Sequence, residues 1–390
     1  MPIRNRLAEL HPEITAWRRH LHQNPELMYE LHETASFVID RLKEIGVDEI
    51  TPGIGKTGVV AVIKGKTDTS GRVIGLRADM DALPIHEASG VDYPSKTPGV
   101  MHACGHDGHT SMLLGAAKYL AETRNFDGTA VLIFQPAEEG GAGGKAMCDD
   151  GMMDRWGIQE VYGLHNMPGF PTGKFAIRPG ALMASSDEFE ITVTVTGKGG
   201  HAAAPHEAID TMLVAAQIVV SLQSVVSRKV DPIKRVVLTV GTFNTDSSAS
   251  NVIAHKAVLE GTVRTLDAEC RAMAEARVRA IAEHTAAAYG ATAEIVWTPG
   301  YPVTVNHEDH TVFAAEAARA VAGDVIEDVD PILPSEDFSY MLEERPGAFI
   351  FMGNGDTAMC HHPAYVFDDE AIPAGSSWFV ELVERRMKVA

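Results

Sequence analysis

One short stretch in the first third of the chain concentrates side chains that bind metals. Residues 101–110 read MHACGHDGHT and contain three histidines, an aspartate and one of the chain's four cysteines. Cys104 and His106 are two residues apart, so a loop backbone can turn both side chains toward one centre. A thiolate and an imidazole together suit zinc or a similar transition metal. By itself, the stretch is also compatible with a polar loop in which histidine happens to recur.

A second candidate lies in the segment FQPAEEGG, where Glu138 and Glu139 follow a strand-like run. Adjacent side chains on an extended backbone point in opposite directions. One carboxylate can therefore bind a metal while the other faces a bound water molecule as a general base. A solvated acidic turn is the competing interpretation of an isolated pair of glutamates.

Histidines follow two further strand-like runs. His165 ends the apolar run in VYGLHN, and CHHPAYVF places His361 and His362 just after the run AFIFMG. A single histidine at such a position is usually structural. The chain has four strand-end sites that carry metal-binding residue types, and His362 represents the last of them. A purely structural role is hard to accept for all four. Together they predict a metal centre.

Other polar residues near these sites are expected to support it. Asp79 and Asp81 in RADMDALP end an apolar strand, and we expect them to accept hydrogen bonds from ligand imidazoles and fix their tautomers. Asp107 and His109 are expected to orient the ligands or to begin the following helix. A different interpretation makes Cys104 a nucleophile that a neighbouring histidine activates.

Composition and charge narrow the class of protein. The formal net charge of -20 repels phosphate groups, so neither nucleic acid nor an anionic membrane is an expected partner. The N-terminal segment has the spacing of an amphipathic helix and lacks the apolar core of a signal peptide. The four cysteines include no CxxC pair, which favours a reducing cytoplasm; Cys104 and Cys360 each have a histidine close by.

The order of elements predicts an α/β protein with an inserted domain. The first half alternates helix-like segments with almost wholly apolar strands, which is typical of a sheet covered by helices on both faces. From residue 183 the predicted order becomes β-α-β-β-α-β, the ferredoxin-like pattern. We therefore predict a catalytic domain in two parts, 1–182 and 298–390, and a compact inserted domain at 183–297.

Motifs along essentially the whole chain resemble those of the M20 peptidase family, in its amidohydrolase branch of hippurate hydrolases, N-acyl-amino-acid amidohydrolases and auxin-conjugate hydrolases. The motifs are, in order, RADMDALP, MHACGHDGHT, FQPAEEGGAGG, GLHNMP, GKGGHAAAPH, SSASNVIAH, EGTVRT and HHPAYVFDDEAI. Several of them are long, so the resemblance is specific at the level of the family.

The resemblance implies a centre of two divalent metal ions, with the thiolate between them. It implies five ligands: Cys104, His106, Glu139, His165 and His362. Zinc, manganese, cobalt and nickel all tolerate this mixed set. Glu138 would then be the general base. No ligand position departs from the family pattern, and the cysteine is typical of the amidohydrolase branch.

The resemblance also assigns roles to the inserted domain. It would act as a lid and join two subunits, giving a homodimer or homotetramer in which His201 enters the active site of the partner. Asn251 and Arg264 would hold the substrate carboxylate, a group that arginine binds through two hydrogen bonds. A turn cap and a surface ion pair are the alternative roles of these two residues.

The expected activity is metal-dependent hydrolysis of the amide bond of N-acyl-L-amino acids. A dipeptidase or aminopeptidase of the same family is the alternative enzyme. A binding protein that keeps the fold without the chemistry is the third hypothesis, and the retained Glu138 argues against it.

Overall fold

The chain folds into two compact units. In the computed structural model, residues 3–194 and 199–389 are described. The first unit contains Met1–Leu182, Val305–Asp330 and Asp337–Ala390, and the second contains Met183–Thr304 and Pro331–Glu336. The second unit runs past the predicted end at residue 297. The Tyr301 carbonyl still accepts the Ser186 backbone N–H, and the Tyr301 backbone N–H donates to the Ser186 hydroxyl.

The first unit is built on a mixed sheet of eight strands in the order β1-β2-β4-β3-β5-β16-β6-β15. The four strands β4, β3, β5 and β16 are neighbours and run parallel to one another. Strand β7 pairs with β14 in a separate two-stranded sheet. The strands are β1 (Glu49–Ile54), β2 (Gly58–Lys64), β3 (Val73–Asp79), β4 (Thr129–Gln135), β5 (Glu160–Met167), β6 (Phe175–Ala176), β7 (Gly180–Met183), β14 (Thr304–Asn306), β15 (Val325–Ile326) and β16 (Gly347–Gly353).

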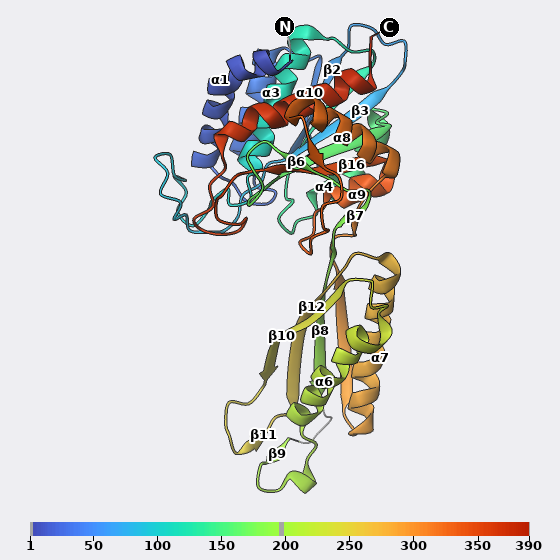
Figure 1. Cartoon of the computed structure of the whole chain (residues 1–390). Coiled ribbons are helices and arrows are strands. Elements are labelled where there is room, and N and C mark those ends of the chain that lie inside the picture. Colours follow the sequence, from blue (N-terminus) through green and yellow to red (C-terminus); the bar gives the residue numbers. More distant parts are fainter. Residues whose placement is uncertain (1–2, 195–198, 390) are drawn as a thin grey trace. The chain divides into compact units, whose positions relative to one another are not determined.

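The parallel strands are buried on both faces, which explains their apolar sequences. On one face α1, α2, α3, α8 and α10 share a single core cluster with the strands, and Figure 1 shows α1, α3 and α10 packed together. The shorter α4 and α9 contact each other and these strands. The helices are α1 (Ile3–Gln23), α2 (His32–Ile45), α3 (His106–Thr123), α4 (Gly143–Asp149), α5 (Met152–Arg155), α8 (Glu308–Ala322), α9 (Phe338–Glu344) and α10 (Ile372–Arg386), with a 3-10 turn at Asp369–Ala371.

The second unit has a four-stranded antiparallel sheet in the order β10-β12-β8-β13. Two helices cover one face of it, with Asp210 and Asp267 capping their N-termini through side-chain hydrogen bonds. This arrangement confirms the predicted β-α-β-β-α-β order. The elements are β8 (Ser185–Thr194), β9 (Gly200–His201), α6 (Thr211–Lys229), β10 (Val236–Thr245), β11 (Val252–Ile253), β12 (Lys256–Thr265), α7 (Ala268–Ala288) and β13 (Thr292–Pro299), with a 3-10 turn at Pro205–Glu207.

Helix α6 is the most apolar helix of the second unit. Among the described residues it alone has the length and composition of a membrane span. Its inner side chains, which include Val214, Ile218 and Leu222, are fully or almost fully buried in the core of the unit. The outer face leaves Met212 and Val220 exposed. Packing on the sheet therefore explains the apolar side chains on the inner face of α6. It does not explain those on the outer face, which are exposed.

A buried carboxylate fastens the helical layer to the start of β5. The carboxylate of Glu160 accepts hydrogen bonds from the Tyr162 hydroxyl (2.8 Å) and the Arg386 guanidinium (3.0 Å), and lies 3.3 Å from His310 Nε2. Burial raises the pKa of Glu160, but the hydrogen bonds from these three side chains outweigh it and lower the pKa to about 2. The ionised form is therefore the one that the fold stabilises.

We predict that Glu160→Gln destabilises the first unit. At neutral pH the loss of a charged, hydrogen-bonded acceptor should lower the free energy of unfolding by about 1–3 kcal/mol. The folded-state pKa lies below the ordinary value of 4.5, so this contribution is complete above pH 4.5 and is lost as the pH falls toward 2. Urea unfolding of both proteins at several pH values should show the difference shrinking toward acid. A difference that stays constant with pH would contradict this.

Candidate metal centre

The predicted site residues of the first unit meet at one edge of the sheet. Because β3, β4, β5 and β16 are parallel neighbours, their carboxyl ends lie side by side, where open α/β sheets place their sites. Asp79 ends β3, the two glutamates follow β4, His165 lies on β5, and the loop after β16 brings a further histidine. Cys104 and His106 come from the segment that begins α3.

Five side chains at this edge form overlapping groups with metal-ligand geometry. The ligand atoms of Cys104, His106 and His165 lie within 4.8 Å of one another, as do those of Cys104, Glu139 and His361. The Cys104 sulfur is 3.4 Å from His165 Nε2, and His361 Nε2 is 3.2 Å from Glu139 Oε1. Cys104 belongs to both groups, which is the position expected of a thiolate between two metal ions.

Backbone acceptors fix two of the imidazole rings. The Nδ1 atom of His106 is 2.8 Å from the Asp81 carbonyl oxygen, and Nδ1 of His165 is 2.6 Å from the Asn166 carbonyl oxygen. A ring nitrogen that faces a carbonyl must carry a proton, so the neutral form of each ring has its unprotonated nitrogen at Nε2, the form that can bind a metal ion. The Nε2 atom of His106 is buried without a hydrogen-bond partner among the described residues. A metal ion would satisfy this atom.

The electrostatics of the edge also favour a bound cation. Burial lowers the pKa of His106, but Asp79, Asp81 and Glu139 outweigh it and raise the pKa to about 10. Burial raises the pKa of Glu139, whereas His361 and His106 lower it, with a net decrease. The Glu139 carboxylate is thus held ionised in a largely buried place, where unpaired charge is costly. The donor set and its charge both fit divalent metal ions.

Asp81 holds the glutamate pair in place. Its carboxylate accepts the backbone N–H of Glu138 (2.9 Å) and of Glu139 (3.0 Å), while its carbonyl accepts from His106. The preceding Ala137 has a φ of +52°, a region that is unfavourable for residues other than glycine. Asp81 therefore fixes the tautomer of His106, as expected of an aspartate here, but it does so through its backbone carbonyl. Its carboxylate positions the loop that carries Glu138 and Glu139.

Asp79 contacts His109, which is not one of the candidate ligands. Its Oδ1 is 2.6 Å from His109 Nδ1, and its Oδ2 accepts from Arg77 at 2.7 Å and lies 3.7 Å from His106 Nε2. His109 in turn accepts the backbone N–H of Asn166 at Nε2. Asp79 therefore fixes the tautomer of His109, the histidine behind the site, rather than that of a candidate ligand.

The structure corrects one predicted ligand by a single position. His361, not His362, reaches the cluster. His361 has a φ of +67°, and its backbone N–H donates to the Ala103 carbonyl at 2.8 Å, so the turn directs its ring toward Glu139. The His362 ring is exposed and accepts the backbone N–H of Ala364 at Nδ1. Adjacent histidines in a turn point in different directions, which the sequence alone could not decide.

Several supporting residues were missed because they are distant in sequence. Asn166 donates to the Cys104 carbonyl at 2.6 Å and accepts from the Tyr365 hydroxyl at 2.6 Å. Arg77 donates to Asp337, which also accepts the Gly144 backbone N–H. Only the position of Asn166 beside His165, in the quoted motif GLHNMP, could have suggested a role. The two Arg77 contacts join residues with no local sequence signal.

The second unit carries the three other predicted site residues. His201 pairs with Val252 across β9 and β11, next to Asn251, whose carbonyl accepts the Ala202 backbone N–H. Both His201 and Asn251 are exposed. Arg264 lies near the end of β12 and donates to the Ser335 hydroxyl at 3.2 Å. The first residues of the motif GKGGHAAAPH, 197 and 198, lie outside the described residues.

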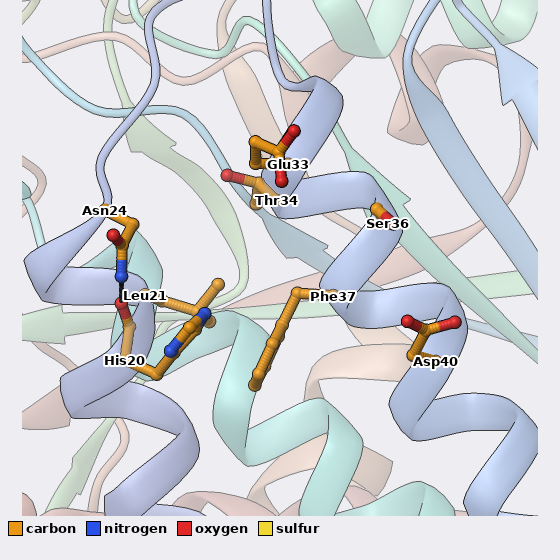
Figure 2. Close-up of a pocket in the computed structure, with 8 residues that line it drawn as sticks. All are labelled: His20, Leu21, Asn24, Glu33, Thr34, Ser36, Phe37 and Asp40. Carbon is orange, nitrogen blue, oxygen red and sulfur yellow. Dashed lines mark hydrogen bonds between the residues drawn. The ribbon is translucent and has the colours of Figure 1, made fainter.

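One surface cavity of the first unit is unrelated to this cluster. It lies between α1 and α2, and Figure 2 shows the His20 ring beside the Phe37 ring at its wall. Its lining residues are His20, Leu21, Asn24, Glu33, Thr34, Ser36, Phe37 and Asp40. None of the candidate ligands is among them, so this cavity is separate from the strand-end cluster.

We predict that the two adjacent histidines differ sharply when substituted. His361→Ala should lower the affinity for the metal ions by more than about tenfold, because it removes a ligand atom. His362→Ala is the matched control and should leave the metal content unchanged. Metal content after dialysis, with the thermal shift on adding metal, measures both. Equal metal loss in the two variants would contradict the assignment of His361.

Comparison with known proteins identifies the relatives of this chain. The model of peptidase family M20/M25/M40 matches residues 75–385. The chain is 44% identical to N-acetyl-L-cysteine deacetylase of Bacillus subtilis, covering 97% of this chain and 89% of that protein. It is 41% identical to hippurate hydrolase of Campylobacter jejuni, covering 98% of each.

A solved structure shows the same fold over its whole length. A dinuclear metal binding peptidase of the M20 family from Bacillus subtilis superposes with a TM-score of 0.86 at 35% identity, covering 98% of this chain and 100% of that one. The match spans both units, so the similarity is not confined to the metal-binding half. The chain therefore belongs to peptidase family M20 and is a hydrolase of its amidohydrolase type.

Proposed function

We propose that the protein hydrolyses the amide bond of N-acyl-L-amino acids of the hippurate and N-acetyl-amino-acid type. The observation that carries the proposal is the strand-end cluster, in which Glu138 lies beside the candidate ligands His106 and Glu139 with ligand atoms within 4.8 Å. The relatives that act on N-acetylcysteine and hippurate support the substrate class.

The proposed ligands of two divalent metal ions are the side chains of Cys104, His106, Glu139, His165 and His361. When bound, such ions lower the pKa of a coordinated water molecule and polarise a carbonyl oxygen. Residues of the chain itself orient the ligands and transfer protons. The Asp81 carbonyl and the Asn166 carbonyl orient two of the imidazoles, as in other metal sites in which the second ring nitrogen is hydrogen-bonded.

Glu138 is the proposed general base. Glu138 is buried, with 7% of the residue exposed, and its backbone N–H donates to the Asp81 carboxylate. We infer that the Glu138 carboxylate takes the proton of the attacking water and then gives it to the leaving amine nitrogen. Proton transfer of this kind typically accelerates a reaction by about 10²- to 10⁴-fold. Glu139 cannot share the role, because its carboxylate faces His361.

The substrate carboxylate and oxyanion require groups from the second unit, and these lie at its two ends. A strand rises about 3.3 Å per residue, so Lys256 and Arg264 of β12 lie roughly 26 Å apart. His201 lies on β9, and Asn251 directly precedes β11. Figure 1 shows the β9 and β11 pair at one end of the second unit, and in the chain β11 comes just before the start of β12, whereas Arg264 lies near its other end. One small substrate cannot contact both ends of the same unit.

A homodimer resolves this separation. We propose that Arg264 binds the substrate carboxylate in its own subunit, while the partner supplies His201 as an oxyanion donor and Asn251 as a further carboxylate contact. The uncovered face of α6 supports an interface on the second unit, because Met212 is 54% exposed, Leu213 49% and Val220 67%. A homotetramer of two such dimers is equally compatible with this interface.

We further propose a reducing compartment such as the cytoplasm. All four cysteines are free thiols, including the buried Cys148 and Cys270. A chain that worked in an oxidising compartment would more often pair them.

We predict that Glu138→Gln abolishes turnover and keeps the metal. On N-acetyl, N-benzoyl and indole-acetyl amino acids, the variant should lose about 10²- to 10⁴-fold in kcat, since the amide cannot accept a proton. The metal content should equal that of the wild type. Assays on protein reconstituted separately with zinc, manganese, cobalt and nickel measure both. Wild-type turnover by the variant would refute the role of Glu138.

The same assays separate the alternatives. Dipeptides with a free amino group should be poorer substrates than the acylated amino acids; the opposite order would favour a dipeptidase or aminopeptidase. Chelation should remove the activity, and the metal should restore it. Full activity after chelation, together with loss on thiol alkylation, would instead indicate nucleophilic catalysis by Cys104.

We predict that the site is shared between subunits. Glu138→Gln and His201→Ala should each be nearly inactive alone, yet co-expression should restore about a quarter of the wild-type activity, since half of the dimers are mixed and each has one complete site. Size-exclusion chromatography with light scattering should show a dimer. If His201 acts within its own chain, co-expression will restore nothing.

Substitutions of two exposed valines test where the interface lies. Val220→Glu on α6 should convert the dimer to a monomer and abolish activity. Val296→Glu on β13 changes a side chain that is 53% exposed elsewhere on the unit, and should leave the dimer intact. Dissociation by both substitutions or by neither would place the interface elsewhere.

A further inference from the structure

The candidate metal centre has a second thiol at its border that the proposed reaction does not use. Cys360 directly precedes His361, and its side chain lies next to that of Cys104. A backbone hydrogen bond of 2.8 Å from His361 to Ala103 holds the two chain segments together one residue away from each cysteine. Both cysteines are free thiols. Two thiols in contact can form a disulfide when the backbone allows the required geometry.

Cys360 is placed differently from the candidate ligands. Among residues 3–194 and 199–389 it belongs to none of the groups whose ligand atoms lie within 4.8 Å of one another, whereas Cys104 belongs to two. Cys104 is 8% exposed, and Cys360 is only half-buried. Cys360 is therefore the less buried of the two residues, and the one that a small oxidant would meet first.

We propose that Cys104 and Cys360 form an oxidation site, at which a peroxide converts the two thiols to a disulfide and so removes Cys104 from the metal centre. The Cys360 thiolate attacks one peroxide oxygen, which breaks the O–O bond and gives a sulfenic acid and hydroxide; the hydroxide takes up the proton that the thiol released and becomes water. The Cys104 thiolate then attacks the sulfenic sulfur, forming the S–S bond and releasing the second water. The two thiols lose two electrons, and hydrogen peroxide is reduced to two waters.

The consequence for the metal follows from the chemistry of sulfur. A thiolate is a metal ligand, whereas a disulfide sulfur is a poor one. Oxidation should therefore release metal from the cluster, and thiol reductants should reverse the change. The link to metal release rests on the proposed metal centre, while formation of the disulfide does not.

The test treats the metal-loaded enzyme with hydrogen peroxide. We expect the loss of two of the four free thiols, a decrease of about 2 Da in intact mass, and a linked peptide pair containing Cys104 and Cys360. Metal release and loss of activity should accompany these changes, and dithiothreitol followed by metal should reverse them. Oxygen addition to Cys104 with no linked peptide would overturn the proposal.

Variants separate this proposal from failure of the proposed function. Cys360→Ser and Cys360→Ala should keep the untreated activity, form no linked peptide, and resist reversible inactivation. Cys270→Ser, in the second unit, is the matched control and should respond as the wild type does. A disulfide without metal release would refute the role of Cys104 as ligand but not the oxidation site. Reversible inactivation of both Cys360 variants at the wild-type rate would refute the oxidation site.

Discussion

The concentration of negative charge at the carboxyl ends of four parallel strands is the constraint on which the first unit depends. Asp79, Asp81 and Glu139 surround His106 in a buried place, and the burial of ionised carboxylates is costly unless positive charge compensates them. Arg77 supplies part of that charge from the interior of β3. The fit of the remaining donors to divalent metal ions explains how such a cluster is tolerated.

Around this edge, the fold uses hydrogen bonds to hold functional groups whose own backbone is unfavourable. Ala137 and His361 both have positive φ values, and both lie at or next to a residue of the cluster. The Asp81 carboxylate fixes the segment that follows Ala137, and the Ala103 carbonyl fixes the segment of His361. Backbone strain of this kind persists only where the surroundings over-determine it. It directs Glu138 and His361 toward the site.

In the second unit, the three candidate site residues lie on or beside the strands of antiparallel sheets. The sheet separates His201 and Asn251 from Arg264 by most of the length of β12. A rigid unit of this shape suits a site that two subunits complete together. The proposed dimer would also cover the apolar outer face of α6, on which Met212 and Val220 are exposed.

The sequence by itself determined the fold class, the inserted ferredoxin-like unit and four of the five candidate ligands. Period and composition report which faces are buried, and metal-binding residue types stand out at strand ends because few other roles explain them together. The family resemblance indicated which glutamate is the ligand, Glu139, and which is the general base, Glu138.

Only the tertiary structure decided between His361 and His362, since the direction of a side chain in a turn depends on the backbone torsions and on a hydrogen bond to Ala103. It also decided the contacts of Asn166 and Cys360 with Cys104, which join residues far apart in the chain. Such contacts leave no periodic signal in the sequence, because they arise only when separate strands and loops meet at the same edge of the sheet.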